Sequence, residues 1–233
     1  MTPALRAVVF DLDSTLSEYA LTVEEVLDRA VPRAGFAADA LGPLDRLAKD
    51  YNSAWWSAEE ILRVPTDELR RRAWTVILEA RGIDDASTAR RLADAYSDIR
   101  KETGFHLFDG VRALLADLRT RYRVGILTNG PSDMQWEKLR TLELTDAVDA
   151  IVVAGDLGIF KPDPRPFRQI LDRLGALPRD ALYVGNSYDH DIVGAHGAGM
   201  KTAWVTANGA AETTEIVPDH VVRRATDLRE VLL

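Results

Sequence analysis

The sequence contains no cysteine, which excludes disulfides, thiolate metal sites and cysteine nucleophiles. It also lacks an apolar run that approaches the length of a membrane span. Its first residues do not combine the charged start, apolar stretch and small-residue cleavage site of a secretory signal. We therefore expect a cytoplasmic protein with no membrane partner.

Positively charged residues are fewer than negatively charged ones. The chain has 29 Lys and Arg against 37 Asp and Glu, and its formal net charge is -8. A nucleic-acid backbone requires a basic surface, so we expect no polynucleotide partner. A small anionic ligand would have to be attracted by local groups, because the field of the whole molecule opposes it. The 233 residues suffice for one large α/β domain or for a core that carries an inserted module.

Short apolar runs rich in β-branched residues recur along the chain and indicate strands that are buried on both faces. Amphipathic stretches separate these runs and predict helices. The predicted strands cover 6–10, 123–127, 150–153 and 181–184, with further candidates at 201–206 and 220–222, and the predicted helices cover 111–122, 132–142, 166–174, 192–198 and 226–232. This alternation predicts an α/β fold with a doubly wound, Rossmann-like parallel sheet.

The alternation is interrupted between residues 17 and 104, where helical periodicity dominates and no buried-strand run occurs. We interpret this stretch as an inserted all-helical domain. The α/β core would then comprise residues 1–16 and 105–233. Within the insertion, Tyr51, Trp55 and Trp56 could form an aromatic wall over a substrate, but packing inside the helical domain is the favoured interpretation.

Polar residues follow the predicted strands closely. In an open parallel sheet the carboxyl ends of the strands converge on the place where ligands bind. The residues concerned are Asp11, Asp13, Thr128, Asn129, Lys161, Asn186, Ser187 and Asp191. They offer carboxylates for a hard divalent cation, a hydroxyl and amides for phosphoryl oxygens, and one ammonium group that balances the negative charge.

Four short motifs occur in a fixed order: DLDSTL at 11–16, TNG at 128–130, KPDP at 161–164, and a fourth that runs from Gly185-Asn186-Ser187 to Asp191. Together they resemble the motifs of the haloacid dehalogenase-like (HAD) hydrolases. The position of the insertion resembles the branch of that superfamily whose helical cap follows the first strand. Residues 17–104 would then be the cap domain.

The resemblance implies a two-step reaction at Asp11, which would attack phosphorus and form an aspartyl phosphate that water then hydrolyses. Asp13 would be the general acid and base. Thr128 through its hydroxyl and Asn129 through its backbone N–H would bind the phosphoryl oxygens. Lys161 would offset the negative charge of the phosphate and the carboxylates.

The resemblance also implies Mg²⁺ as the cofactor. Its ligands would be Asp11, the backbone carbonyl of Asp13, Asn186 and Asp191. The family most often has Asp where this chain has Asn186, and an amide oxygen contributes no charge, so we expect weaker metal binding or a greater share for Asp191.

The presence of Asp13 favours a phosphatase over a dehalogenase, because an alkoxide leaving group needs an acid and a halide does not. The predicted substrate is a small phosphorylated metabolite. A phosphomutase and a haloacid dehalogenase on the same core remain open, as does a non-catalytic member that binds a ligand. The sequence does not predict the individual substrate or the oligomeric state.

Overall fold

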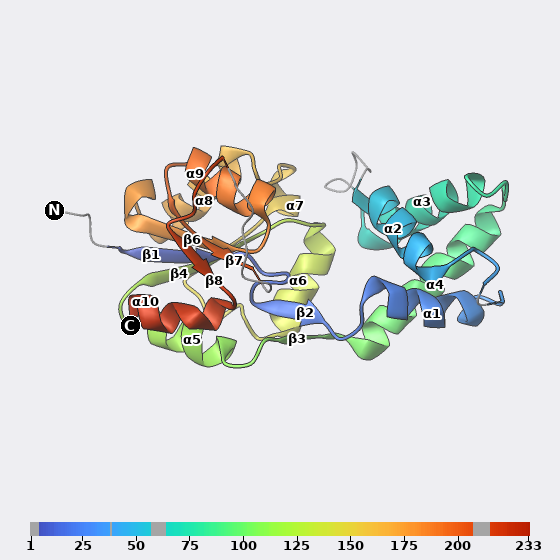
Figure 1. Ribbon diagram of the computed structural model, residues 1–233, viewed down its shortest axis with the longest axis horizontal. Coiled ribbons are helices and arrows are strands. Elements are labelled where there is room, and N and C mark those ends of the chain that lie inside the picture. The colour runs from blue at the N-terminus through green and yellow to red at the C-terminus, as the bar shows by residue number, and fades with distance from the viewer. Residues whose placement is uncertain (1–4, 38, 57–63, 207–214) are drawn as a thin grey trace. The chain divides into compact units, whose positions relative to one another are not determined.

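The computed structural model describes residues 5–37, 39–56, 64–206 and 215–233 (Figure 1). The chain divides into two compact units. One comprises Met1–Glu18 with Leu107–Leu233, and the other comprises Tyr19–His106. In the described residues, no helix is both long enough and apolar enough to span a membrane.

The larger unit is built on a six-stranded sheet with the order β5-β4-β1-β6-β7-β8. All neighbouring strands are parallel. The strands are β1 (Ala7–Phe10), β4 (Arg123–Thr128), β5 (Ala150–Val153), β6 (Ala181–Gly185), β7 (Lys201–Val205) and β8 (His220–Val222). The predicted doubly wound parallel sheet is confirmed.

Helices cover both faces of this sheet. Figure 1 shows α8 and α9 on one face, and α5 and α10 on the other. The helices are α5 (Val111–Leu118), α6 (Ser132–Thr141), α7 (Ala154–Leu157), α8 (Pro164–Leu174), α9 (Val193–Gly197) and α10 (Arg229–Leu232), with short 3₁₀ segments η1 (Pro178–Asp180) and η3 (Ala225–Leu228). Because both faces are covered, every residue of β1 is fully buried.

Three helix predictions differ from the structure either by more than two residues at an end or in the type of helix. The helix predicted at 111–122 ends at Leu118, whose carbonyl accepts the N–H groups of Arg121 and Tyr122 in a closing turn. The helix predicted at 192–198 is preceded by a π-helical segment, η2 (Tyr188–Ile192), and the closing helix predicted at 226–232 begins as the 3₁₀ segment η3. Periodicity does not resolve such changes of helical type over single turns.

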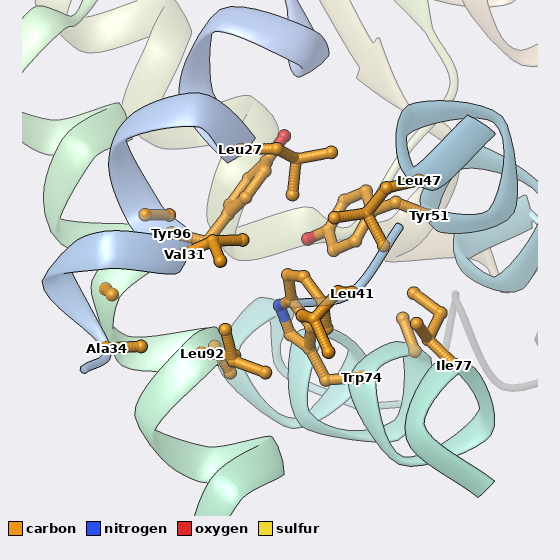
Figure 2. Close-up of a cluster of buried hydrophobic side chains, with 14 of the residues drawn as sticks. Leu27, Val31, Ala34, Leu41, Leu47, Tyr51, Trp74, Ile77, Leu92 and Tyr96 are labelled. Carbon is orange, nitrogen blue, oxygen red and sulfur yellow. The ribbon is translucent and has the colours of Figure 1, made fainter. Parts of the chain in front are cut away.

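The described residues of the second unit form four helices: α1 (Val23–Arg33), α2 (Leu44–Trp56), α3 (Thr66–Glu79) and α4 (Ala86–Thr103). Figure 2 shows the apolar side chains that they bury against one another. Tyr51 stacks on Tyr96 with 4.5 Å between ring centroids and also contacts Trp74. Tyr51 and Trp55 are both buried, which agrees with a packing role, while the side chain of Trp56 lies outside the described residues.

A two-stranded sheet joins the chain segments that lead between the two units. It pairs β2 (Ser17–Tyr19) with β3 (Phe105–Leu107). At its ends, Phe108 N donates to Leu16 O at 3.0 Å and Ala20 N donates to Gly104 O at 3.2 Å. These strands were not predicted, because three residues are too few for a periodic pattern to show.

The order of the strands fixes where a site can form. The chain passes from β4 to β5 on one side of β1, and from β6 through β7 to β8 on the other. The connections diverge at β1, and in sheets of this kind ligands bind outside the carboxyl ends of the strands at the divergence, here β4, β1 and β6. Asp11, Thr128 and Asn186 lie at or directly after these three ends.

Candidate active site

Asp11 is the first residue after β1, and its side chain forms a buried ion pair with Lys161. Its backbone N–H donates to Val184 O at 2.8 Å, which fixes the end of β1 against β6. Lys161 Nζ lies 2.7 Å from Asp11 Oδ1 and 2.6 Å from Asp191 Oδ1. Three predicted site residues from three distant motifs therefore meet at one ammonium group.

The position of Lys161 is fixed by further hydrogen bonds at both ends of the residue. Its Nζ donates to the Tyr183 hydroxyl at 2.9 Å and to Leu127 O at 3.3 Å. Its backbone is held by the Asn129 side chain, whose Nδ2 donates to Lys161 O at 3.1 Å and whose Oδ1 accepts from Lys161 N at 2.9 Å. The amide of Asn129 thus connects the end of β4 to the segment that carries the lysine.

The pKa values at the site are governed by burial and by one cation that two buried carboxylates share. Burial, opposed by the ammonium of Lys161 and reinforced by the charge of Asp191, raises the pKa of Asp11 from 3.8 to about 7. Burial alone would lower the pKa of Lys161, but attraction to Asp11 and Asp191 raises it above its ordinary value. Burial and the nearby carboxylates raise the pKa of Tyr183 well above 10, so its hydroxyl stays protonated.

Asp191 lies on η2 and is almost fully buried. Its Oδ1 accepts from Lys161, and its Oδ2 accepts from Ser187 N at 2.9 Å. A β-carbon at Gly185 would lie only 2.3 Å from Asp191 Oδ2, so the close approach of this carboxylate requires glycine at the end of β6. Protein donors thus engage both oxygens of Asp191.

The carboxylate of Asp13 is held by two residues of α6. Gln135 Nε2 donates to Asp13 Oδ2 at 2.9 Å, and Lys138 Nζ donates to Asp13 Oδ1 at 2.7 Å. The Asp13 side chain keeps 37% of its surface exposed, whereas Gln135 and Lys138 are buried. Neither α6 residue was among the predicted site residues. The available signal was their spacing of three on the helix that follows the TNG motif, which places them on one face.

Thr128 and Asn186 line the same strand ends through more local contacts. Thr128 is buried, and its hydroxyl donates to Asn129 O at 3.3 Å. Asn186 Oδ1 accepts from the Thr15 hydroxyl at 3.3 Å, and its backbone O accepts from Trp204 Nε1 at 2.9 Å. Asn186 is therefore linked to the DLDSTL motif by Thr15.

The oxygen atoms at these strand ends suit a hard cation that takes only a few of its ligands from the protein. No group of three or more His, Cys, Asp or Glu side chains in the described residues is arranged to hold a metal ion. A Mg²⁺ ion needs fewer, because it keeps several waters and is commonly bound by one or two carboxylates together with substrate oxygens. The carboxylate of Asp11, the amide oxygen of Asn186 and the backbone carbonyl of Asp13 are oxygen atoms of the kinds that such an ion accepts.

A family model described as haloacid dehalogenase-like hydrolase matches residues 5–199. This chain belongs to the haloacid dehalogenase-like hydrolases. The predicted resemblance is thereby confirmed, since the match includes all four motifs. One relative, the phosphoserine phosphatase of Thermus thermophilus, is 32% identical and aligns over 98% of both chains.

Solved structures of this HAD family have the same architecture. A 2-haloacid dehalogenase from Pseudomonas syringae pv. Tomato DC3000 superposes with a TM-score of 0.69 at 30% identity, covering 98% of each chain. The putative HAD-hydrolase YfnB from Bacillus subtilis, bound to magnesium, superposes with a TM-score of 0.71 at 26% identity over 98% of this chain and 99% of that one. The HAD core is thus shared by relatives named for two different reactions.

Proposed function

We propose that this HAD hydrolase is a Mg²⁺-dependent phosphatase of small organic phosphate monoesters that works through an aspartyl phosphate. The observation that carries the proposal is the second carboxylate, Asp13, held by α6 two residues after Asp11. An alkoxide leaves from phosphorus only if it receives a proton, and a carboxyl group at this place can supply it. The phosphatase among the relatives supports the same reaction class.

In the first half-reaction, a carboxylate oxygen of Asp11 forms a bond to phosphorus while the bond from phosphorus to the ester oxygen breaks. Asp13 gives its proton to the departing oxygen. The Thr128 hydroxyl and the Asn129 backbone N–H would donate to the phosphoryl oxygens. Lys161 offsets the charge that Asp11, Asp191 and the phosphoryl group bring together.

In the second half-reaction, water attacks the phosphorus of the aspartyl phosphate. Asp13, now ionised, accepts a proton from that water, and Asp11 leaves as a carboxylate. Inorganic phosphate is released and both aspartates return to their starting states. The same residue thus acts as an acid and then as a base, which requires a carboxyl group that stays in place between the two steps.

The proposed ligands of the ion are Asp11, the backbone carbonyl of Asp13 and Asn186. When bound, Mg²⁺ neutralises charge on the phosphoryl oxygens and aligns the group for in-line attack. Asp191 also belongs to the proposed metal site. Because Lys161 and Ser187 engage both of its oxygens, we assign it a contribution of negative charge.

The decisive experiment measures phosphate release from p-nitrophenyl phosphate and from a panel of metabolite monoesters, with Mg²⁺ and with a chelator. Asp11→Asn removes the nucleophile. Asp172→Asn changes an exposed aspartate on α8 and serves as the matched control. The proposal expects Mg²⁺-dependent release by the wild type and the control, and none by Asp11→Asn. Release that survives Asp11→Asn would overturn it.

Dehalogenation is the second candidate, because the superposed Pseudomonas syringae structure is described as a 2-haloacid dehalogenase. Asp11 would then attack carbon and displace a halide, with no proton needed by the leaving group. Halide release from 2-haloacids in the presence of a chelator, with no phosphate release from any ester, would favour this candidate. We propose a small phosphorylated metabolite as the partner and the cytoplasm as the location.

A further inference from the structure

Two buried side chains of α6 hold both carboxylate oxygens of Asp13, although they come from a segment more than a hundred residues away in the sequence. Lys138 Nζ lies 2.7 Å from Asp13 Oδ1, and Gln135 Nε2 lies 2.9 Å from Asp13 Oδ2. Residues three apart on a helix share one face, so both donors reach Asp13 from the same direction. The carboxylate can therefore neither rotate nor shift without losing one of them.

The orientation of the Gln135 amide is determined by its partners. Its Nε2 donates to Asp13 Oδ2 and also to the backbone carbonyl of Asn129, so the NH₂ end of the amide, which has two hydrogens, faces both oxygen acceptors. A β-carbon at Gly130 would lie 2.6 Å from Gln135 Nε2, so glycine at this place makes room for the amide. The TNG motif and α6 thus form one support beneath Asp13.

The burial of Gln135 and Lys138 agrees with a role at Asp13. Only 1% of Gln135 and 2% of Lys138 is exposed, and a buried ammonium group is costly unless it is paired. The ammonium of Lys138 is paired with the Asp13 carboxylate, and 37% of the Asp13 side chain remains exposed. The donors thus hold both oxygens of the carboxylate while part of its surface stays accessible.

We propose that Lys138 and Gln135 are positioning residues that hold the Asp13 carboxyl group at a fixed place for proton transfer to and from the reacting oxygens. This inference rests on the phosphatase function proposed above. Proton transfer requires a heavy-atom separation within hydrogen-bond reach, and a displacement of about 1 Å can cost about 10²-fold in rate. A carboxylate that is free to rotate would lose that alignment.

Substrates with different leaving groups distinguish a positioning role of Lys138 and Gln135 from a role in stability alone. p-Nitrophenolate is a stable anion and departs without a proton, whereas an alkoxide does not. The ratio kcat/KM reports only the steps up to formation of the aspartyl phosphate, so it isolates the acid role of Asp13 from its later role as a base. A variant with a misplaced Asp13 should therefore lose kcat/KM on alkyl phosphates far more than on p-nitrophenyl phosphate.

The test compares Lys138→Met with Arg140→Met, which removes an exposed cation from the same helix. For Lys138→Met we expect kcat/KM on glycerol phosphate to fall by about 10²-fold, and on p-nitrophenyl phosphate by less than about 3-fold. Arg140→Met should match the wild type on both. Combining Lys138→Met with Asp13→Asn should add no further loss on glycerol phosphate beyond that of Asp13→Asn alone.

Equal losses on both esters, no loss on either, or a gain in activity would overturn the inference. Gln135→Met removes the donor to the other oxygen and tests the same prediction if Lys138→Met does not fold. A wild type that releases no phosphate from any ester would instead refute the proposed function. The two failures are thus distinguishable, since the first requires an active wild type.

Discussion

The ammonium group of Lys161 lies 2.7 Å from the Asp11 carboxylate in a setting where both side chains are almost completely buried. Asp191 approaches the same ammonium from another side at 2.6 Å. Within the described residues, two buried carboxylates thus share the single ammonium group of Lys161.

Removal of the ammonium should destabilise the fold. Lys161→Met leaves Asp11 and Asp191 as unpaired buried carboxylates, and breaking a buried pair in this way costs about 3–5 kcal/mol of unfolding free energy. The loss should be larger at pH 8 than at pH 5, because pH 5 lies below the raised pKa of Asp11, about 7, and a protonated Asp11 needs no counter-charge. Urea unfolding at both pH values measures it, with the exposed Lys49→Met as the control. An equal loss at both pH values would contradict this account.

Neutralisation of Asp11 should instead stabilise the fold, and the gain in stability should grow as the pH rises. Its folded-state pKa is raised from 3.8 to about 7, so the folded state binds the proton more tightly than the unfolded state. The stability that this contributes is fully present below pH 3.8 and is lost as the pH rises through 7. Relative to wild type, Asp11→Asn should therefore gain stability between these pH values, by at most about 4 kcal/mol.

Unfolding of wild type and Asp11→Asn in a chelator at pH 5 and pH 8 checks this difference. Asp172→Asn on the surface of α8 provides the control for loss of a negative charge. A stability difference that stays constant from pH 5 to pH 8 would mean that the Asp11 carboxyl group is not perturbed by its buried surroundings.

A methyl group at Gly185 should displace Asp191 and so disturb its ion pair with Lys161. The added β-carbon would lie 2.3 Å from Asp191 Oδ2, so Gly185→Ala displaces the carboxylate and should cost about 1–3 kcal/mol together with activity. Gly197→Ala, where an added β-carbon meets nothing within 4 Å, should be neutral or slightly stabilising. Thermal unfolding of the two variants measures the difference in stability between them. The site account is wrong if Gly185→Ala behaves like Gly197→Ala.

The amide of Asn186 offers a prediction about metal affinity. Asn186→Asp adds a negative charge to a proposed ligand, so the dissociation constant for Mg²⁺ should fall. Isothermal titration calorimetry of wild type, Asn186→Asp and the exposed control Asn52→Asp measures this directly. An unchanged affinity in Asn186→Asp would remove this residue from the proposed ligands.

Much of the fold could be predicted because β1, β4 and β6 are buried on both faces and therefore appear in the sequence as short, nearly continuous apolar runs. Their carboxyl ends also indicated where Asp11, Thr128 and Asn186 would gather. The strands β2 and β3 have three residues each and carry no such pattern. Local sequence likewise gives no sign of the change to a π-helix at η2.

The contacts of Asp13 could not be predicted for a different reason. Gln135 and Lys138 share a helix face that the spacing shows, but their partner lies 122 and 125 residues earlier in the chain. The packing of α6 beside the end of β1 brings them together, and a single sequence does not specify that packing. The metal ligation and the roles of the site residues remain predictions.

The most direct test of the central claim is to search for a phosphoryl group on Asp11 during turnover. Asp13→Asn lacks the base for the second half-reaction, so rapid acid quenching of this variant with p-nitrophenyl phosphate should trap the intermediate. Peptide mass spectrometry should then locate one hydroxylamine-sensitive phosphoryl group on Asp11, and Asp11→Asn should carry none. Release of p-nitrophenolate without any phosphorylated Asp11 would contradict the account.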